Sequence, residues 1–279
     1  MASNDVSRWF DPAPVYTSMA TAPPECEGES FRIKKWCKTF EGAFFCGMEW
    51  DEWNLVNALV RPTNTVLELG GRFGTTSCVL ARRTGNSGGV VSVEPDTKAH
   101  KALLNNRARH NCSFAVVRGT VGDTPLVVSR KFGHYATQTS VASSMDTKRA
   151  VPNLSFTTLE QRIGRPFDTL LIDCEGCIDS FFMGSNRRLL SQLTLILMEE
   201  DVPHVVDYRK WHARFRKHGF ERIWNIRDTF EPSAEWSRNI SHSAWRRGGL
   251  GNLPSCEQYA REAKLSRRWL YCRDPASQD

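Results

Sequence analysis

The chain has 279 residues, of which 40% are hydrophobic and 24% are charged, ordinary values for a globular protein. This length excludes a disulfide-dependent miniprotein and is sufficient for one large α/β domain with additions. The longest apolar runs are about as long as a strand and fall well short of the roughly 20 residues that cross a bilayer, so no membrane span is expected.

The net charge of +6 is concentrated after Asp201. A basic region of this kind could attract phosphates or an acidic surface. However, the two signs are interspersed at a sequence pI of about 8.9, which is more typical of a solvated face. The composition therefore does not favour a nucleic-acid partner.

The nine cysteines are scattered and show no paired metal-type spacing. This pattern predicts reduced thiols in an intracellular protein. The N-terminus carries Asp5 and Asp11 without a continuous apolar stretch, which predicts neither a signal peptide nor a membrane anchor. We therefore expect a cytoplasmic location.

Residues 1–48 are predicted to form an irregular N-terminal arm, because prolines interrupt them. Its aromatic residues, Trp9 and Trp36 among them, indicate that the arm packs against the remainder, residues 49–279. A helix is predicted from Glu49 to Val60, where apolar residues recur at helical spacing before a proline.

Short apolar strands then alternate with amphipathic helices. The predicted strands are Val66–Leu69, Gly89–Val93, Ser113–Val117, Phe167–Asp173 and Leu193–Glu199. Strict alternation favours parallel strands with right-handed crossovers and helices on both faces. The predicted fold class is α/β, a Rossmann-like, doubly wound, mostly parallel sheet.

Two stretches, residues 120–160 and 231–266, break this alternation and are predicted to be insertions over the active edge. The first is expected to contain a hairpin of Leu126–Ser129 and Tyr135–Thr139, and the second shows no clear period. The segments Phe220–Phe230 and Arg268–Arg273 read as strands that could pair antiparallel at one edge of the sheet.

The first strand of the alternation runs into a glycine turn and a helix, in the sequence Val66-Leu-Glu-Leu-Gly-Gly-Arg-Phe-Gly-Thr-Thr-Ser77. Gly70 and Gly74 permit close approach of backbone to a ligand, and the helix N-terminus offers unpaired N–H groups. The turn, with Gly71 and Arg72, therefore predicts a nucleotide site. The spacing is neither Gly-x-Gly-x-x-Gly nor a phosphate loop, which argues against a nicotinamide-dependent oxidoreductase and against an NTPase.

Two acidic residues indicate which nucleotide this is. Glu68 precedes the turn, where a carboxylate would repel a pyrophosphate but would suit an amine and a sulfonium. Glu94 ends the second strand, where a carboxylate accepts hydrogen bonds from ribose hydroxyls. S-adenosylmethionine fits this description, with Pro95 beside Glu94 and with adenine near Gly119 to Asp123, after the third strand. The alternative is that Glu68 and Glu94 are loop-edge carboxylates without a ligand.

The fourth strand of the alternation ends in Leu170-Leu-Ile-Asp-Cys-Glu-Gly176, at the sheet edge where such folds place their ligands. Asp173 and Glu175 could hold the cofactor's amino group, deprotonate a substrate hydroxyl, or bind a divalent cation together with Glu199 or Glu200. Alternatively, Asp173 could cap a helix that begins at Gly176. Cys174-x-x-Cys177 resembles a redox pair, but its place within this element favours packing cysteines.

Weaker candidates lie further along the same edge. The acidic run Glu199-Glu200-Asp201 ends the fifth strand, and His204 beyond it is expected to be an exposed loop residue. Residues proposed for the substrate mouth are His134, Tyr135 and Gln138. Trp211 and Phe215, one helical turn apart, are expected in the core.

Together these elements resemble the FkbM-like methyltransferases. The resemblance covers Val66 to Glu200 and rests on Glu68-x-Gly-x-x-x-Gly74, Val93-Glu94-Pro95, Leu104-x-Asn106, Thr158-Leu159, and Ile172-Asp173-x-Glu175-Gly176 through Gly184. This class I, Rossmann-like family uses S-adenosylmethionine and typically methylates hydroxyls of sugars or natural products. The chain departs from the family pattern at Arg72, where Asn is usual, at Leu171, where Lys is common, and at Ile178, where a third acid is usual.

The resemblance implies an S-adenosylmethionine-dependent methyltransferase acting on a hydroxyl of a small-molecule or sugar-like acceptor. Asp173 or Glu175 would then be the general base, and the protein would chiefly position the reactants and exclude water. Two alternatives remain open at this point: a module that binds the cofactor without turnover, and a nucleic-acid methyltransferase.

Overall fold

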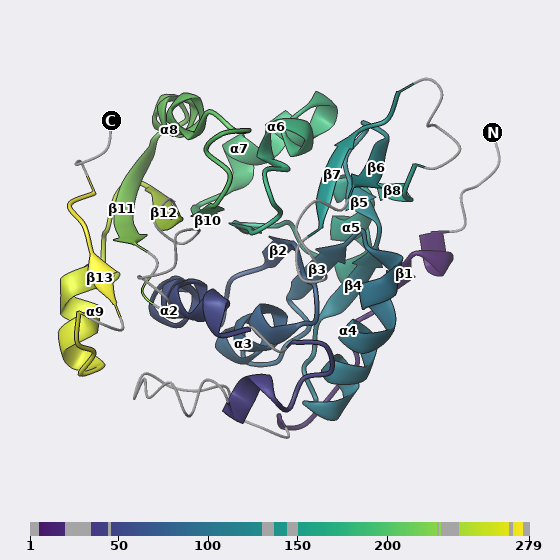
Figure 1. Ribbon diagram of the computed structural model, residues 1–279, viewed down its shortest axis with the longest axis horizontal. Coiled ribbons are helices and arrows are strands. Elements are labelled where there is room, and N and C mark those ends of the chain that lie inside the picture. The colour runs from purple at the N-terminus through teal and green to yellow at the C-terminus, as the bar shows by residue number, and fades with distance from the viewer. Residues whose placement is uncertain are drawn as a thin grey trace.

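The computed structural model describes residues 6–19, 35–43, 46–129, 137–143, 150–227, 229, 240–267 and 270–275. Its centre is a nine-stranded sheet in the order β1-β4-β3-β2-β9-β10-β12-β11-β13 (Figure 1). These strands are β1 Phe10–Asp11, β2 Val66–Leu69, β3 Val90–Glu94, β4 Ala115–Arg118, β9 Thr169–Ile172, β10 Leu195–Glu200, β11 Phe220–Arg227, β12 Ser241–Arg247 and β13 Tyr271–Cys272.

Five consecutive strands of the sheet, from β4 to β10, are parallel. Strand β12 is antiparallel to both β10 and β11, and β1 is antiparallel to β4. The predicted α/β fold, a mostly parallel Rossmann-like sheet with an antiparallel edge, is thereby confirmed. The chain runs outward from β2 through β3 to β4 and then returns to the other side of β2 with β9, so β2 and β9 flank the topological switch point at which such sheets bind ligands.

Helices cover both faces of the sheet. They are α2 Trp50–Leu59, α3 Thr75–Arg83, α4 Thr97–Arg109, α5 Phe156–Ile163, α6 Ile178–Phe181, α7 Leu189–Gln192, α8 Tyr208–Lys217 and α9 Cys256–Glu262. Apolar residues of α2, α3 and α4 form one buried cluster against the sheet, and those of α5 to α8 form a second on its other face. In Figure 1, α6, α7 and α8 accordingly lie on one side of the central strands and α2 and α3 on the other.

The helices that matter for the site begin at recognisable signals. Gly74 precedes α3 with a left-handed backbone (φ +85°), which glycine adopts without a steric penalty. Asp96 caps α4 by accepting a hydrogen bond from the backbone N–H of Lys98 at 3.0 Å. Only five residues separate β2 from α3 and only two separate β3 from α4, so the turns between strand and helix are short.

The first predicted insertion contains the expected hairpin. Strands β6 Leu126–Ser129 and β7 Gln138–Val141 pair antiparallel, while β5 Thr120–Val121 and β8 Asn153–Leu154 pair parallel beside them. Part of the predicted second strand, from Tyr135, lies outside the described residues.

The C-terminal part of the sheet differs from the prediction. Ile226 and Arg227 do pair with β13, as expected. However, β12 lies within the stretch where no period was visible, and it pairs along its whole length with β10 and β11. Its sequence, Ser-His-Ser-Ala-Trp-Arg-Arg, has too few apolar residues to show a strand pattern, although five of the seven are buried.

The N-terminal arm packs as predicted: Phe10 is buried in the strand pair with β4, and Trp36 and Phe40 are buried beneath α4 and its neighbours.

The prediction of reduced thiols, in contrast, is wrong. Disulfides join Cys37–Cys46, Cys78–Cys112, Cys174–Cys177 and Cys256–Cys272. Cys78 and Cys112, far apart in the sequence, meet only through the fold, so their spacing gave no sign of a bond. Cys174 and Cys177 did resemble a redox pair, and the expectation that they are merely packing cysteines is wrong.

Candidate functional site

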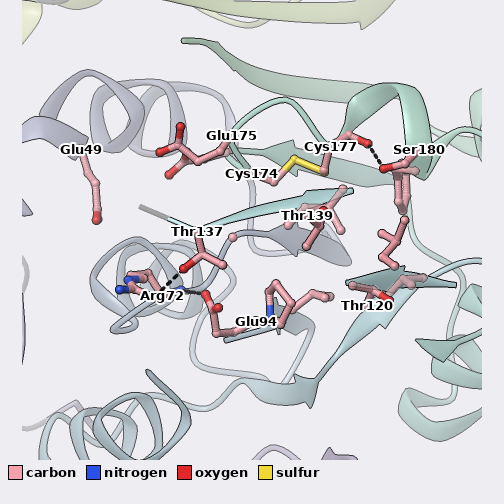
Figure 2. Close-up of a pocket in the computed structure, with 18 residues that line it drawn as sticks. Glu49, Arg72, Glu94, Thr120, Thr137, Thr139, Cys174, Glu175, Cys177 and Ser180 are labelled. Carbon is pink, nitrogen blue, oxygen red and sulfur yellow. Dashed lines mark hydrogen bonds between the residues drawn. A yellow bond between two sulfur atoms is a disulfide. The ribbon is translucent and has the colours of Figure 1, made fainter. Parts of the chain in front are cut away.

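A cavity opens at the carboxyl ends of β2, β3 and β9, at the topological switch point (Figure 2). Its walls come from the turn after β2, the end of β3, the loop after β9, and the hairpin residues Thr137 and Thr139. Glu49, at the end of the short helix η2 (Cys46–Glu49), closes one side. Elements far apart in the sequence thus converge on the place where the fold predicts a ligand.

The glycine turn brings the backbone of β2 against that of β9. Gly70 has φ +104°, and a Cβ there would lie 1.5 Å from the Asp173 carbonyl oxygen. At Gly71 a Cβ would lie 1.9 Å from Ser92 Oγ, and at Gly74 it would press on the Leu103 side chain. Gly70 lines the cavity, whereas Gly71 and Gly74 permit the close packing beneath it.

Glu94 is buried in the wall at the tip of β3, as its place in the sequence predicted. Its carboxylate accepts hydrogen bonds from the backbone N–H of Arg72 at 2.9 Å and of Asp96 at 2.6 Å. Burial raises the pKa of Glu94 to about 7, although these hydrogen bonds and the nearby Arg72 act in the opposite direction. Glu94 therefore holds the turn in place and presents its oxygens beside the cavity, next to Pro95.

Arg72 joins three parts of the wall. Its backbone is left-handed (φ +36°), and its Nη1 donates to Asp96 Oδ2 at 3.0 Å and to Thr137 Oγ1 at 2.9 Å. Figure 2 shows Arg72 between Glu94 and the hairpin residue Thr137. The guanidinium thus ties the inserted hairpin to the glycine turn, which the turn's sequence alone did not reveal.

Glu68 occupies a different position from the one its place in the sequence suggested. It belongs to a neighbouring strand of Glu94, as predicted, but its side chain does not line the cavity. Side chains alternate along a strand, and that of Glu68 points to the face covered by α3, where Ser77 Oγ donates to Oε2 at 2.5 Å. Burial raises the pKa of Glu68 to about 7, and Oε1 has no hydrogen-bond partner.

This burial predicts that Glu68 lowers stability at alkaline pH. Between pH 4.5 and about 7 the folded state keeps a proton that the unfolded chain has lost, so stability falls as pH rises and the full cost is present above pH 7. Glu68→Gln should therefore raise the free energy of unfolding at pH 8.5 by about 2–3 kcal/mol and leave it unchanged near pH 4. Urea unfolding at the two pH values measures this. Glu257→Gln, on an exposed position of α9, should change neither value, and an equal gain for Glu68→Gln at both would contradict the explanation.

The opposite wall carries Asp173 and Glu175 from the loop after β9. Burial and the adjacent Glu199, with which Asp173 shares a hydrogen bond, raise the pKa of Asp173 well above its usual range. Burial and the charge of Asp201 raise the pKa of Glu175 to about 9. Glu175 therefore retains its proton at neutral pH, as expected for a buried carboxyl close to other carboxyls.

Residues behind this wall hold it in position. His242 Nε2 lies 3.5 Å from Glu199 Oε1, and Tyr208 donates its hydroxyl proton to Asp201 Oδ1 at 2.9 Å.

Asp173 does not cap a helix, since α6 begins only at Ile178 after Cys177. The alternative in which Asp173 merely caps a helix is therefore wrong.

Other sequence candidates lie outside the cavity. Asp123, expected near adenine, is exposed and accepts the backbone N–H of Ser185 at 2.8 Å, at the start of the short helix η4 (Gly184–Arg188). Glu200 contacts His212 and Ser243 instead. The structure confirms His204 as exposed and Trp211 and Phe215 as core residues. Gln138, predicted at the substrate mouth, is buried and does not line the cavity, although Thr137 and Thr139 on either side of it do. His134 and Tyr135 lie outside the described residues.

Two acidic residues of the site were missed from the sequence. Glu49 lines the cavity and accepts hydrogen bonds from the hydroxyls of Thr75 and Thr76 on α3. Glu52 lies behind it, where burial and the charge of Asp173 raise its pKa well above its usual range. In the sequence, Glu49 and Glu52 are only two acidic residues at the start of a helix. Acidic residues are common there in helices that have no functional site.

The same carboxyls do not form a metal site. Within the part of the chain that the structure describes, no three His, Cys, Asp or Glu side chains are arranged to hold a metal ion. The divalent cation considered for Asp173, Glu175 and Glu199 thus has no ligand set among these residues.

Across the described residues, no helix combines the length and the apolar character that spanning a membrane requires.

No protein-family model and no curated protein sequence matches the chain. Several solved structures resemble it weakly. Fibrillarin from Aeropyrum pernix with natively bound S-adenosyl-L-methionine is 15% identical over 70% of this chain and 76% of that chain, with a TM-score of 0.43. The ribosomal protein L11 methylase from Lactobacillus delbrueckii is 14% identical over 74% and 80%, with a TM-score of 0.42. At TM-scores below 0.5, these likenesses do not indicate what this chain binds.

Proposed function

We propose that this protein is a class I, S-adenosylmethionine-dependent methyltransferase related to the FkbM-like family. Its acceptor is a hydroxyl of a small or sugar-like molecule. The observation that carries the proposal is the position of Glu94, a buried carboxylate at the tip of β3 that faces a glycine turn at the switch point. A carboxylate there suits ribose hydroxyls, and the acidic wall opposite suits a cation.

The residues present fit this cofactor. Ribose would meet Glu94, the methionine part would meet the backbone of Gly70 to Arg72, and its amino group would meet Asp173. Four of the lining residues carry carboxyl groups, and the guanidinium of Arg72 is already engaged by Asp96. When bound, the cofactor supplies a methyl group on a positively charged sulfur. Because carboxyls with raised pKa values lose their protons more readily beside a positive charge, the site favours a cationic ligand.

Glu68 and Asp123 take other roles in this proposal. Glu68 supports α3 from below through Ser77 rather than touching the cofactor. Asp123 fixes the start of η4. Thr120 and Val121, which line the cavity after β4, then take the adenine end.

The chain's own acid–base group would be Asp173 or Glu175. Each lies in the cavity wall, and each has a raised pKa, which makes its carboxylate a stronger base than an ordinary one. The glycine turn, Arg72 and the hairpin position the reactants and exclude water. The domain proper then spans residues 49–279, with the hairpin at 120–160 over the acceptor.

Retention of tritiated S-adenosylmethionine by the pure protein tests cofactor binding. Glu94→Gln should weaken binding at least tenfold, because a hydrogen bond to a charged group contributes about 1.5–3 kcal/mol. Glu257→Gln is the matched control and should bind normally. Nicotinamide dinucleotide should not compete, because its pyrophosphate would meet the acidic wall. Equal binding by both variants would refute the assigned role of Glu94.

Turnover is tested separately from binding. Labelled methyl transfer to small-molecule fractions of a cell extract should mark a hydroxyl-bearing product. Binding without labelling of any fraction would favour a non-catalytic module. Labelling of the nucleic-acid fraction, together with steeply salt-dependent binding, would favour a nucleic-acid methyltransferase.

The cytoplasmic location expected from the sequence rested on reduced thiols. The structure pairs eight of the nine cysteines, and the ninth, Cys26, lies outside the described residues. Disulfides persist mainly in oxidising compartments, so an oxidising compartment is proposed in place of the cytoplasm.

A further inference from the structure

One disulfide forms part of the cavity wall. Cys174 and Cys177 are bonded to each other in the loop after β9, and both line the cavity. The loop is the one that carries Asp173 and Glu175, and Figure 2 shows the sulfur–sulfur bond on the same side of the cavity as Glu175 and Ser180. A change in this bond would therefore act directly on the wall of the site.

This disulfide differs from the others in exposure. Cys174 and Cys177 are both half-buried and border the cavity, so a thiol can approach them from solvent. In contrast, each of the other three disulfides has at least one cysteine that is 4% exposed or less. Because thiol–disulfide exchange requires direct attack on a sulfur atom, access separates exchangeable disulfides from inert ones.

It also differs in the length of chain that it closes. Its sequence separation is 3, against 9, 16 and 34 for the others. A disulfide restricts the unfolded chain more strongly when its loop is longer. This bond therefore contributes least to stabilising the fold.

The loop between the two cysteines has an uncommon backbone conformation. Glu175, between the two cysteines, has φ +53°, which is uncommon for a residue with a side chain, and Gly176 has φ +89°. The Cys177 carbonyl then accepts the backbone N–H of Phe181 and the hydroxyl of Ser180, each at 2.8 Å. The closed loop is thus continuous with the first turn of α6.

We propose that Cys174–Cys177 is a thiol–disulfide exchange site through which a thiol reductant changes the cavity wall. The thiolate of the reductant attacks one of the two sulfurs, breaks their bond and forms a mixed disulfide. A second thiol of the reductant then resolves it. Two electrons and two protons pass to the cysteines, which become thiols, while the reductant becomes a disulfide. This property goes beyond the proposed methyl transfer, and its test needs no cofactor.

Reduction of the intact, folded chain tests the exchange site. The protein is incubated with dithiothreitol or with reduced glutathione without denaturant, and free thiols are trapped with iodoacetamide and located by peptide mass. The Cys174–Cys177 pair should be alkylated at least tenfold faster than the other three pairs, which serve as internal controls. Reaction with both reagents indicates an open site, and reaction with the dithiol alone indicates that resolution by a second thiol of the same molecule is required. Reduction of all four pairs together, or of this pair last, would overturn the proposal.

Hydrogen exchange tests the link to the wall. Amides of the first turn of α6, including that of Phe181, should exchange at least tenfold faster after selective reduction, and reoxidation should restore the slow rate. The double variant Cys174→Ser with Cys177→Ser should exchange at the fast rate in both conditions. Selective reduction with unchanged exchange in α6 would show that the bond does not control the wall. Both readouts are independent of S-adenosylmethionine, so they stand even if the proposed function fails.

Discussion

Gly70→Ala should abolish cofactor retention and lower the free energy of unfolding by at least about 3 kcal/mol. The new Cβ would lie 1.5 Å from the backbone carbonyl oxygen of Asp173, and Gly70 and Asp173 directly follow the paired strands β2 and β9. No side-chain rotation can relieve this overlap, so β2 and β9 would have to separate at the cavity. The left-handed φ of +104° adds strain of the order of 1–3 kcal/mol for any residue other than glycine.

Gly85→Ala is the matched control for this substitution. Gly85 also has a positive φ, +66°, but a Cβ there would meet nothing within 4 Å. It should therefore cost only the backbone penalty of about 1–2 kcal/mol and leave cofactor retention intact. Urea unfolding and tritiated S-adenosylmethionine retention measure both variants. Equal stability of the two would mean that β2 and β9 do not approach as closely as the structure shows.

Removing the Cys78–Cys112 disulfide by Cys78→Ala with Cys112→Ala should lower the free energy of unfolding by about 4 kcal/mol. The bond joins α3 to the segment before β4 across a sequence separation of 34, so it restricts a long loop of the unfolded chain. Both cysteines are fully buried, and alanine avoids placing unpaired hydroxyls in that apolar region.

The pair Cys174→Ala with Cys177→Ala provides the comparison. The same chain-entropy relation gives about 2 kcal/mol for so short a loop, roughly half the effect. Urea unfolding under non-reducing conditions gives both values. An unchanged unfolding midpoint for the Cys78 and Cys112 variant would indicate that this bond does not form in the protein.

The sequence alone predicted the parallel core of this fold. Four-residue, mainly apolar segments such as Val66–Leu69 and Thr169–Ile172 are buried along their whole length, so their strand character is visible in consecutive residues. Gly70 and Glu94, predicted from their place at strand ends to bind the cofactor, both line the cavity, and their cofactor contacts stay a prediction. Strand β12 was missed because its sequence lacks an apolar strand pattern, and it is buried only because it pairs with β10 on one side and β11 on the other.

Tertiary structure decided which groups face one another. Glu68 is one residue from a strand end, yet the helix covering its face, and not its sequence neighbourhood, determines that it meets Ser77 and not the cavity. Glu49 joins the site only because α3 and η2 pack together, and Cys78 meets Cys112 only because α3 packs beside the segment before β4. Local patterns encode which element forms, since backbone periodicity is a property of adjacent residues. The partners of a carboxyl or a thiol come from distant segments, and folding alone brings these together.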